Sequence, residues 1–332
     1  TTMQGGGFET PSASLADGGV YFNGLTTWRG TVVIDGAARQ NGDAIVSMSS
    51  TINAGLFDMD GATGDARWDI DANLNLNADQ IGTTAANNVG GIIDIASNVG
   101  ARLNVQLTDP SASWTMAGQM GLVGLGALTP TRIAGSPMRV QGQIALPIGS
   151  VQISADTTFL GTGPGSHTTI TQAASIMRMN ARTVVESGAD FSGAGTILNS
   201  ATGQMRLDNG ASLGTVGLSN SGRLAIAEQA GVASVDRLQC APTSVWNVSL
   251  GGYTPATEYD QLIVSGGAAA LDGALEVSHL DLGAGEFRPN IGDEFVILTA
   301  LNGVAGSFAA NPVSNVGPLF YQWTVIYEPN TV

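Results

Sequence analysis

The chain has 332 residues, of which only 12% are charged and 6% aromatic, while 46 are glycine. An ordinary globular domain carries about twice that charged fraction. Frequent small residues are typical of tight turns and closely stacked strands. Length and composition therefore favour an all-β chain with many turns over a conventional globular enzyme.

The formal net charge is −15, with 12 basic residues, all of them arginine, against 27 acidic residues. Binding to nucleic-acid phosphates needs a basic surface, so this partner class is excluded. The same charge disfavours an anionic membrane surface. No segment reaches the roughly 18 unbroken apolar residues that span a bilayer, so we expect no membrane insertion.

Cysteine usage excludes a disulfide within the chain, and the first residue indicates an exported protein. Cys240 is the only cysteine, so no disulfide forms within the chain, and a buried structural thiol is expected. The sequence opens at Thr1 rather than Met and contains no signal peptide. We interpret Thr1 as a mature end, which predicts an extracellular or cell-surface location reached through a cleaved signal.

A nine-residue pattern of alternating apolar positions recurs along the chain. Its clearest copies are Trp68–Leu76, Trp114–Leu122 and Met138–Leu146. The copies start about 12 residues or twice that number apart, and steps of about 35 join Trp68 to Leu103 and Leu103 to Met138. A short strand with its turn takes about 12 residues, so three units predict one coil of a triangular β-solenoid. The alternating apolar side chains, including Trp68, would face its core.

Shorter spacings appear farther along. Asn199 and Asn220 are 21 residues apart, and Gly203 and Gly222 are 19 apart. Such steps are ordinary for a right-handed parallel β-helix. Asparagine at matching turns forms stacked side-chain ladders and tolerates left-handed backbone geometry. The coil is therefore predicted to shorten toward residue 230.

Longer strands are predicted after residue 240. They cover residues 260–264, 294–299 and 319–327, and the last has a wholly apolar face formed by Leu319, Tyr321, Trp323, Val325 and Tyr327. Less than a tenth of the chain should be helical, since glycine or proline interrupts nearly every window of about 12 residues. The predicted fold is all-β: a segment or cap over residues 1–30, a right-handed parallel β-helix over 31–240, and a C-terminal β-module over 241–332.

The C-terminal part resembles a known family. The segments that carry the resemblance are Tyr259–Gly266, Leu271–Val277, Gly292–Thr299 and Gly306–Phe308. They look like the end of autotransporter passenger domains and of bacterial surface proteins with autotransporter-associated β-strand repeats, over about residues 195–327. The resemblance implies a right-handed parallel β-helix exported to the cell surface, and it brings no catalytic residues. Since no amphipathic strands for a membrane barrel precede Val332, we expect either a cleaved translocator or another means of anchoring.

These features predict a structural or adhesive surface protein that associates with itself. The strand at 319–327 and the residues before Trp28 would pair head-to-tail between subunits, forming a filament unless rotation closes a ring. The rival interpretation is that both ends cap their own coil. Surface glycans are a second partner class. The alternative functions are a polysaccharide-binding or polysaccharide-degrading β-helix protein, including a trimeric phage-type receptor-binding spike.

Catalytic residues are not predicted. Arg139, Arg178 and Arg206 repeat with the strand pattern, as an outer stack would, and do not converge on one site. His167 and His279 are 112 residues apart without an evident partner, and His167 lies in an expected loop. Nucleophile-elbow, phosphate-loop and metal-binding histidine motifs do not occur.

The densest acidic cluster is the candidate metal site. Asp58, Asp60 and Asp65 surround a glycine turn, with Asp69 and Asp71 close behind. Calcium takes six to eight oxygen ligands, which such carboxylates supply, although the spacing fits no standard calcium loop. Calcium is therefore the candidate cofactor, and solvent-facing aspartates are the simpler alternative.

If the cluster holds calcium, EDTA should lower the melting temperature by several degrees, because bound metal stabilises only the folded state. Asp60→Ala should abolish the response to EDTA in the same thermal melt. A wild-type protein that melts identically with EDTA and with added calcium would leave these aspartates as surface charge.

Overall fold

The computed structural model describes residues 2–15, 20–40, 44–46, 50–58, 67–70, 72–81, 88–89, 92–97, 102–109, 111–124, 130–162 and 166–332. Within these ranges every regular element is a strand and none is a helix, which confirms the predicted all-β class. The chain forms two compact units, residues 1–158 with 163–177 and residues 159–162 with 178–332. The domain limits predicted at residues 30 and 240 stay predictions.

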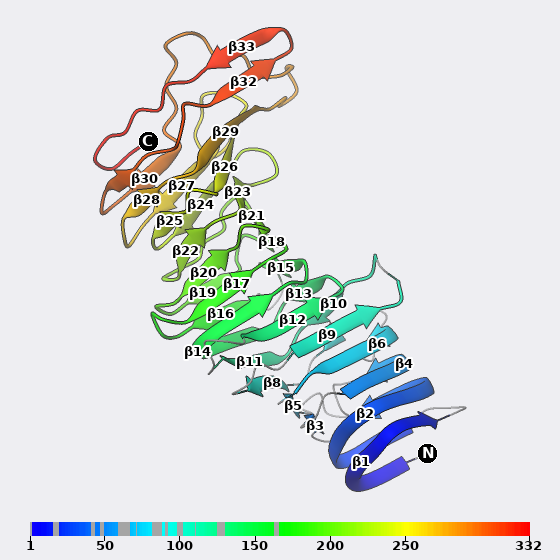
Figure 1. Ribbon diagram of the computed structural model, residues 1–332. Helices are drawn as coiled ribbons and strands as arrows, with labels where there is room; N and C mark the ends of the chain where they lie inside the picture. Colours follow the sequence, from blue (N-terminus) through cyan, green and yellow to red (C-terminus); the bar gives the residue numbers. More distant parts are fainter. Residues whose placement is uncertain are drawn as a thin grey trace. The chain divides into compact units, whose positions relative to one another are not determined.

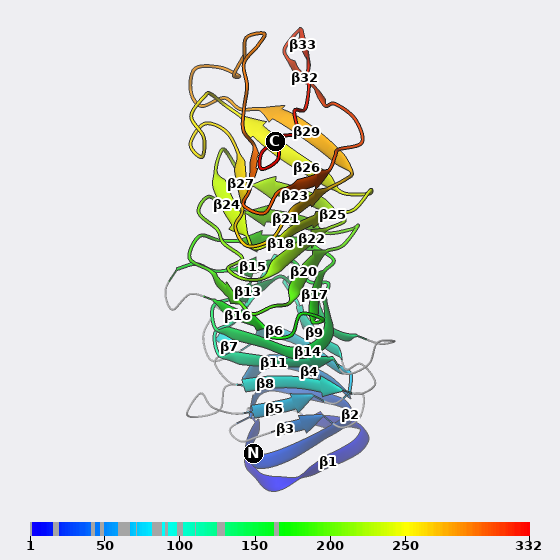
Figure 2. The same ribbon diagram turned by 90° about the vertical axis from the view of Figure 1, so that its left-hand side faces the viewer.

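The first unit is made of parallel strands in three rows (Figures 1 and 2). One row contains β3 (Ala44–Val46), β5 (Arg67–Ile70), β8 (Ile92–Ser97), β11 (Gln119–Gly124), β14 (Gln143–Ile153) and β16 (His167–Ile170). A second contains β1 (Thr2–Leu15), β2 (Val20–Gln40), β4 (Ser50–Asp58), β6 (Leu74–Ile81), β9 (Arg102–Leu107) and β12 (Thr131–Gly135). The third contains β7 (Asn88–Val89), β10 (Trp114–Met116) and β13 (Met138–Val140).

The register of these strands corrects the predicted coil length. Trp68 pairs with Ile93, and Trp114 pairs with Met138. Leu103 pairs with Ile133 rather than Met138. Paired residues in the first unit are thus 18 to 30 apart, from Thr26 with Ala44 to Leu103 with Ile133, and the predicted step of 35 connects strands that do not pair. The doubled 12-residue spacing fits the steps at Trp68 and Trp114.

Alternation along each strand places the predicted apolar residues in the core. Trp68, Trp114 and Met138 are buried, whereas Asp69 and Arg139, which follow Trp68 and Met138, are not, as the two-residue period of a strand requires. Outward asparagines in neighbouring strands also bond to each other. Asn77 Nδ2 donates to Asn53 Oδ1 at 2.8 Å across the β4–β6 pair. Register is therefore reinforced on both faces.

The second unit distributes its strands over three parallel sheets. The first sheet contains β20 (Thr196–Asn199), β22 (Gly217–Asn220), β25 (Leu238–Cys240), β28 (Ala269–Leu271) and β31 (Val304–Gly306). The second contains β18 (Arg182–Val185), β21 (Gln204–Leu207), β23 (Arg223–Ile226), β26 (Val245–Leu250) and β29 (Ala274–His279). The third contains β24 (Val232–Val235), β27 (Gln261–Val264) and β30 (Leu298–Ala300). From β22 to β31 the chain visits the three sheets strictly in turn.

A buried asparagine pair lies where the steps are 19 to 21 residues, as predicted. Steps of 18 to 20 residues also occur between β1, β2, β3 and β4, so the predicted shortening toward residue 230 is not a trend of the whole chain. Asn199 and Asn220 are in register, both are fully buried, and Asn199 Nδ2 donates to Asn220 Oδ1 at 2.7 Å. Neither has a positive φ, so the expected left-handed geometry is wrong. The paired glycines serve a different purpose. A Cβ on Gly222 would lie 2.3 Å from the carbonyl oxygen of Gly203, so the two turns stack closer than a side chain permits.

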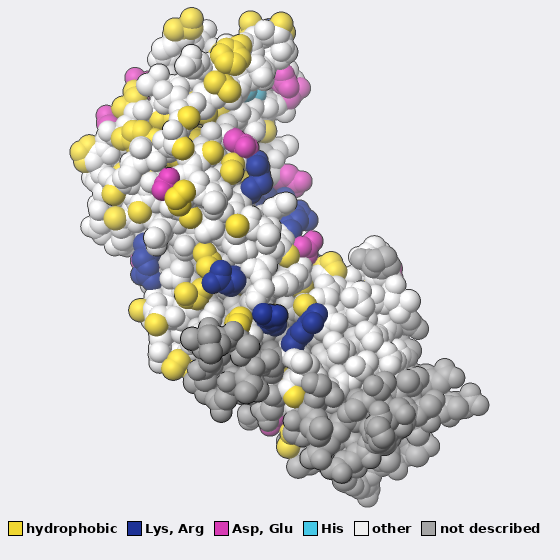
Figure 3. Space-filling view, in the orientation of Figure 1, with side chains coloured by type: hydrophobic (Ala, Val, Ile, Leu, Met, Phe, Trp, Pro, Cys, Tyr) yellow, Lys and Arg dark blue, Asp and Glu magenta, His cyan; other side chains and the backbone are white. Residues whose placement is uncertain are grey.

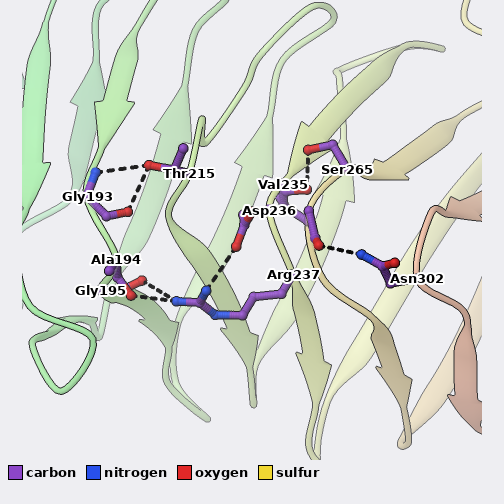
Figure 4. A network of polar contacts seen from close by, with 10 residues as sticks. Gly193, Ala194, Gly195, Thr215, Val235, Asp236, Arg237, Ser265 and Asn302 are labelled. Carbon is purple, nitrogen blue, oxygen red and sulfur yellow. Dashed lines mark hydrogen bonds and ion pairs between the residues drawn. The ribbon is translucent and has the colours of Figure 1, made fainter.

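Polar contacts also join successive turns on another edge of the second unit (Figure 4). Thr215 Oγ1 donates to the carbonyl of Gly193 at 2.8 Å, and Arg237 Nη2 donates to the carbonyl of Ala194 at 2.6 Å. Farther along, Asn302 Nδ2 donates to the carbonyl of Gly266 at 2.6 Å. Each side chain satisfies a backbone group of an earlier turn, which is what turns outside the sheet ladders require.

The C-terminal end changes pattern. β32 (Val313–Val316) and β33 (Leu319–Gln322) form an antiparallel hairpin, so the predicted strand to residue 327 is shorter than expected. The predicted strand over 294–299 is wrong except for its last two residues, which belong to β30. The final residues run antiparallel to β30: the N–H groups of Leu298 and Val332 donate to each other's carbonyls at 3.1 Å. The chain's own end therefore closes the edge of β30.

Asn220→Ala should lower the free energy of unfolding by about 1–3 kcal/mol, since it removes one of the two acceptors of the buried Asn199 amide and leaves it only the Arg223 carbonyl. The matched control is Asn104→Ala, because Asn104 donates to Asn75 at 3.3 Å in a half-buried position where water can substitute. The control should change stability by no more than about 0.5 kcal/mol. Urea denaturation measures both, and equal effects would contradict a special role for the buried pair.

Candidate functional site in the C-terminal aromatic cluster

The predicted calcium site falls largely outside the described residues. Asp60 and Asp65 lie there, as does the side chain of Asp58, whose backbone ends β4. In the part of the chain that the structure describes, no group of three or more metal-binding side chains gathers. The calcium site stays a prediction.

Arg139, Arg178 and Arg206 do not gather at one site. The predicted stack of arginines on the outer surface is wrong for Arg206. Its neighbours in register are Val184 and Ala225, so no arginine lies directly beside it in the sheet. Arg206 Nε instead pairs with Asp208 Oδ1 at 2.7 Å. Arg139 lies on β13, and Arg178 on β17 (Ile176–Met179), both as single outward residues.

Two shallow hollows on the second unit bring no reactive group together. One, of about 350 Å³, lies beside Arg206, Asp208 and Glu228, whose charges offset each other. The other, of about 240 Å³, lies between Gly217 and Arg237 on the face of small residues. Neither contains a histidine, cysteine or tyrosine.

The single thiol is inert. Cys240 is buried at the end of β25, and this burial raises its pKa to about 11, so the thiolate is scarce at neutral pH. This confirms the predicted structural thiol and removes it as a nucleophile.

The histidines have partners that the sequence did not indicate. His167 begins β16 rather than lying in a loop, with Thr169 Oγ1 3.2 Å from its ring. His279 Nε2 is 2.7 Å from Ser314 Oγ, and Trp323 Nε1 donates to the same oxygen at 2.8 Å. Because the Phe287 carbonyl, 3.0 Å from Nδ1, can only accept, Nδ1 of the neutral ring carries the proton. Nε2 therefore accepts from the Ser314 hydroxyl, whose oxygen accepts from Trp323.

This contact has the outline of a serine–histidine pair, but its geometry is structural. Ser314 is only 6% exposed, and its hydroxyl is already hydrogen-bonded to His279 Nε2 and to Trp323 Nε1. A nucleophile has to reach its substrate, and the third group here is a carbonyl rather than a carboxylate. Burial lowers the pKa of His279, which keeps the ring neutral and able to accept from Ser314. The network fixes the β32–β33 hairpin on β29.

Aromatic side chains cluster around the hydrogen-bond network of His279, Ser314 and Trp323. Four of the five tyrosines lie between residues 253 and 327, in a chain poor in aromatic residues. Phe295 is the centre: it contacts the rings of Tyr253, Tyr259, Phe287 and Trp323 at centroid distances of 5.3 to 6.0 Å. We call these rings, together with Tyr321, the aromatic cluster. Tyr321 joins through Trp323 and lies 5.3 Å from the His279 ring.

Apolar side chains are exposed around the cluster. Among the described residues, eleven of the twelve large exposed hydrophobic side chains lie between residues 253 and 327. In Figure 3 hydrophobic side chains gather over the C-terminal end of the second unit. On the hairpin the exposed residues include Leu319 and Phe320, the latter 65% exposed. The apolar face predicted for residues 319–327 is only partly exposed, because Tyr321 and Trp323 pack inward. The exposure of Phe320, on the opposite face of the strand, was not predicted from the sequence.

A buried carboxyl group fixes the segment that carries Tyr253. Asp260 is fully buried, and its two oxygens accept from the N–H groups of Gly231 at 3.0 Å and Ser249 at 2.8 Å. Burial raises the pKa of Asp260 to about 7, although these hydrogen bonds act in the opposite direction. Asp260 therefore joins the end of β26 to the start of β24.

Comparison of the chain with protein-family models finds no match, and comparisons with curated proteins and with solved structures find no significant match. Among the described residues, no helix is present that could cross a membrane. What the chain does therefore has to be argued from its own geometry.

The raised pKa of Asp260 predicts a pH-dependent stability. The folded state holds this proton up to about pH 7, whereas an unfolded aspartate releases it near pH 4. The free energy of unfolding should therefore fall as pH rises from about 4 to 7, by on the order of 1.4 kcal/mol per unit of pKa shift. Urea denaturation between pH 4 and 8 measures the slope.

Asp260→Asn should flatten that slope whatever its effect on absolute stability, because the asparagine side chain does not titrate. Asp208→Asn, at an exposed ion pair, is the control and should leave the slope unchanged. A wild-type slope that survives in Asp260→Asn would assign the pH dependence to other groups.

Proposed function

We propose that the chain is a right-handed parallel β-helix whose C-terminal module ends the stack. The order of the sheets in the second unit supports this arrangement. Parallel strands that visit three sheets strictly in turn, and return to the same sheet after 19 to 36 residues, are what successive coils of a three-sided helix produce. The handedness follows the resemblance of residues 195–327 to autotransporter passenger domains.

We infer that the protein is an extracellular structural protein, a self-associating subunit of a surface fibre, scaffold or adhesin. The observation that carries this proposal is the exposure of two apolar side chains, Val313 and Phe320, on the outward face of the β32–β33 hairpin. Exposed apolar side chains gathered in one region are typical of a surface that a partner covers. The absence of lysine rules out lysine isopeptide cross-links, and the only cysteine, Cys240, is buried, so we expect such a fibre to depend on non-covalent contacts.

The partner proposed for the hairpin is the first strand of a second copy. β1 pairs in parallel with β2, and Figure 1 shows it as the outermost strand at the N-terminal end of its unit. An outermost strand offers a row of backbone groups that another chain can extend. Residues 329–332 already occupy the edge of β30, so the hairpin, whose two strands pair only with each other among the described residues, is the better contact. The contact is head-to-tail and so propagates.

The alternative is a polysaccharide-active β-helix protein or a trimeric receptor-binding spike. Catalysis is not the preferred proposal because, within the described residues, the Ser314–His279 contact and the buried Asp260 carboxyl group both have structural roles. Steady release of reducing or unsaturated ends from a panel of acidic and neutral polysaccharides would favour the enzyme.

Light scattering over a range of concentrations tests self-association. The mean mass of the wild type should rise with concentration, and the double variant Val313→Ser, Phe320→Ser, on the outward face of the hairpin, should weaken association at least about tenfold. Burying each such side chain contributes about 1.5–3 kcal/mol, and 1.4 kcal/mol is a factor of ten. Deleting residues 1–25 should also leave monomers.

Ile148→Ser is the control, because Ile148 is an exposed apolar residue on β14 of the first unit. It should associate like the wild type. A wild type that stays monomeric at high concentration would falsify the proposal, and a fixed trimer at all concentrations would favour the spike.

A further inference from the structure

One aromatic ring of the cluster is exposed and yet held in place. Tyr253 lies in the segment between β26 and β27, whose end is anchored by Asp260, and 52% of the residue is exposed. Phe295 lies nearly parallel to the ring at a centroid distance of 6.0 Å, and Phe287 meets it nearly at right angles at 5.1 Å. The ring is thus supported by two half-buried neighbours while much of it faces solvent.

Hydrogen bonds fix the polar end of the same ring. The Tyr253 hydroxyl donates to Asp293 Oδ2 at 2.7 Å and accepts from Asn290 Nδ2 at 3.0 Å. Glu258 Oε2 accepts from the backbone N–H groups of Tyr253 at 2.9 Å and Thr254 at 2.8 Å. The ring's orientation is therefore set before any ligand arrives, which lowers the entropy cost of binding.

The rim around the ring is anionic. Asp293 and Glu258 are both half-buried, and hydrogen bonds lower the pKa of each: those from Tyr253 and Asn290 at Asp293, and those from Thr254 and Tyr253 at Glu258. Both groups are therefore carboxylates at neutral pH, and each can accept further hydrogen bonds from a ligand.

The exposed Tyr253 ring and the two carboxylates beside it favour some classes of ligand over others. Phosphate, sulfate and uronate groups would be repelled by the two carboxylates. An apolar protein segment would remove water from those carboxylates without supplying donors, which is costly. A quaternary ammonium ligand is best held by several rings around one space, whereas these rings pack against one another. An uncharged sugar ring fits better, because its C–H face stacks on the aromatic ring while its hydroxyls donate to the carboxylates.

We propose that Tyr253, with Asp293, Asn290 and Glu258 at its rim, forms a binding site for one uncharged pyranose ring of a polysaccharide. The site goes beyond the proposed self-association, since it lies on the segment before β27 and on residues 290–293 rather than on the outward face of the hairpin. A flat, open site covers only one face of a sugar, so a single site should bind weakly, with a dissociation constant on the order of 1 mM. Repetition along a fibre would strengthen attachment to a polymer.

The test is retention of the wild type in affinity electrophoresis through neutral polysaccharides, namely β-glucan, mannan, starch and soluble chitin, with heparin as an acidic comparison. At least one neutral polymer should retard the protein, and heparin should not. Retardation should persist in about 0.5 M NaCl, because stacking and neutral hydrogen bonds are little screened.

Tyr253→Ala should weaken retention at least tenfold, while Tyr253→Phe, which keeps the ring and loses its hydroxyl, should retain an intermediate affinity. Phe320→Ala is the matched control, since it removes an equally exposed aromatic ring on the hairpin. A thermal melt should be nearly the same for all three variants. Running the gels at concentrations where light scattering shows monomers separates this proposal from self-association.

Three outcomes would overturn the site. The first is a wild type that no neutral polysaccharide retards. The second is a Tyr253→Ala protein retained as strongly as the wild type. The third is retention that salt or choline chloride abolishes, which would point to a cationic ligand instead.

Discussion

The constraint on which this structure depends is the register of parallel strands. In a parallel stack each residue lies beside its equivalent in the next strand, so a position must suit both its own turn and the neighbouring ones. Asn199 can be fully buried because Asn220 lies in register to accept its amide hydrogen. Gly222 has no side chain because the carbonyl of Gly203 occupies that space. A single residue therefore affects three successive turns.

Where the parallel register ends, near the C-terminus, antiparallel pairing and side-chain contacts replace it. The last residues run antiparallel to β30, and the β32–β33 hairpin lies on β29 through the contact of Ser314 with His279 and Trp323. Aromatic rings and exposed apolar side chains gather in the same region. An open strand edge is a site of uncontrolled pairing, so a stack of this kind needs an irregular end, and an irregular end is also where unusual side chains can be accommodated.

The sequence predicted the repetitive part better than the irregular part, for a physical reason. Alternation decides which face a side chain occupies, so the burial of Trp68 and Trp114 followed from pattern alone. The step between paired strands did not, because turns of different length separate strands of similar length, and Leu103 pairs with Ile133 instead of Met138. No periodicity could bring His279 beside Ser314, since that contact occurs once. The only indication of the aromatic cluster in the sequence is that four of the five tyrosines lie between residues 253 and 327.

The hairpin separates the two proposed binding surfaces. Along the hairpin, alternate side chains point to opposite sides: Tyr321 packs inward against His279, whereas Phe320 points to solvent. The inward side carries the cluster that supports Tyr253 through Phe295. A partner that covers Phe320 would approach the hairpin from the side opposite to Tyr321. The same β-alternation that builds the stacked sheets thus places the proposed self-association surface and the aromatic cluster on opposite sides of the hairpin.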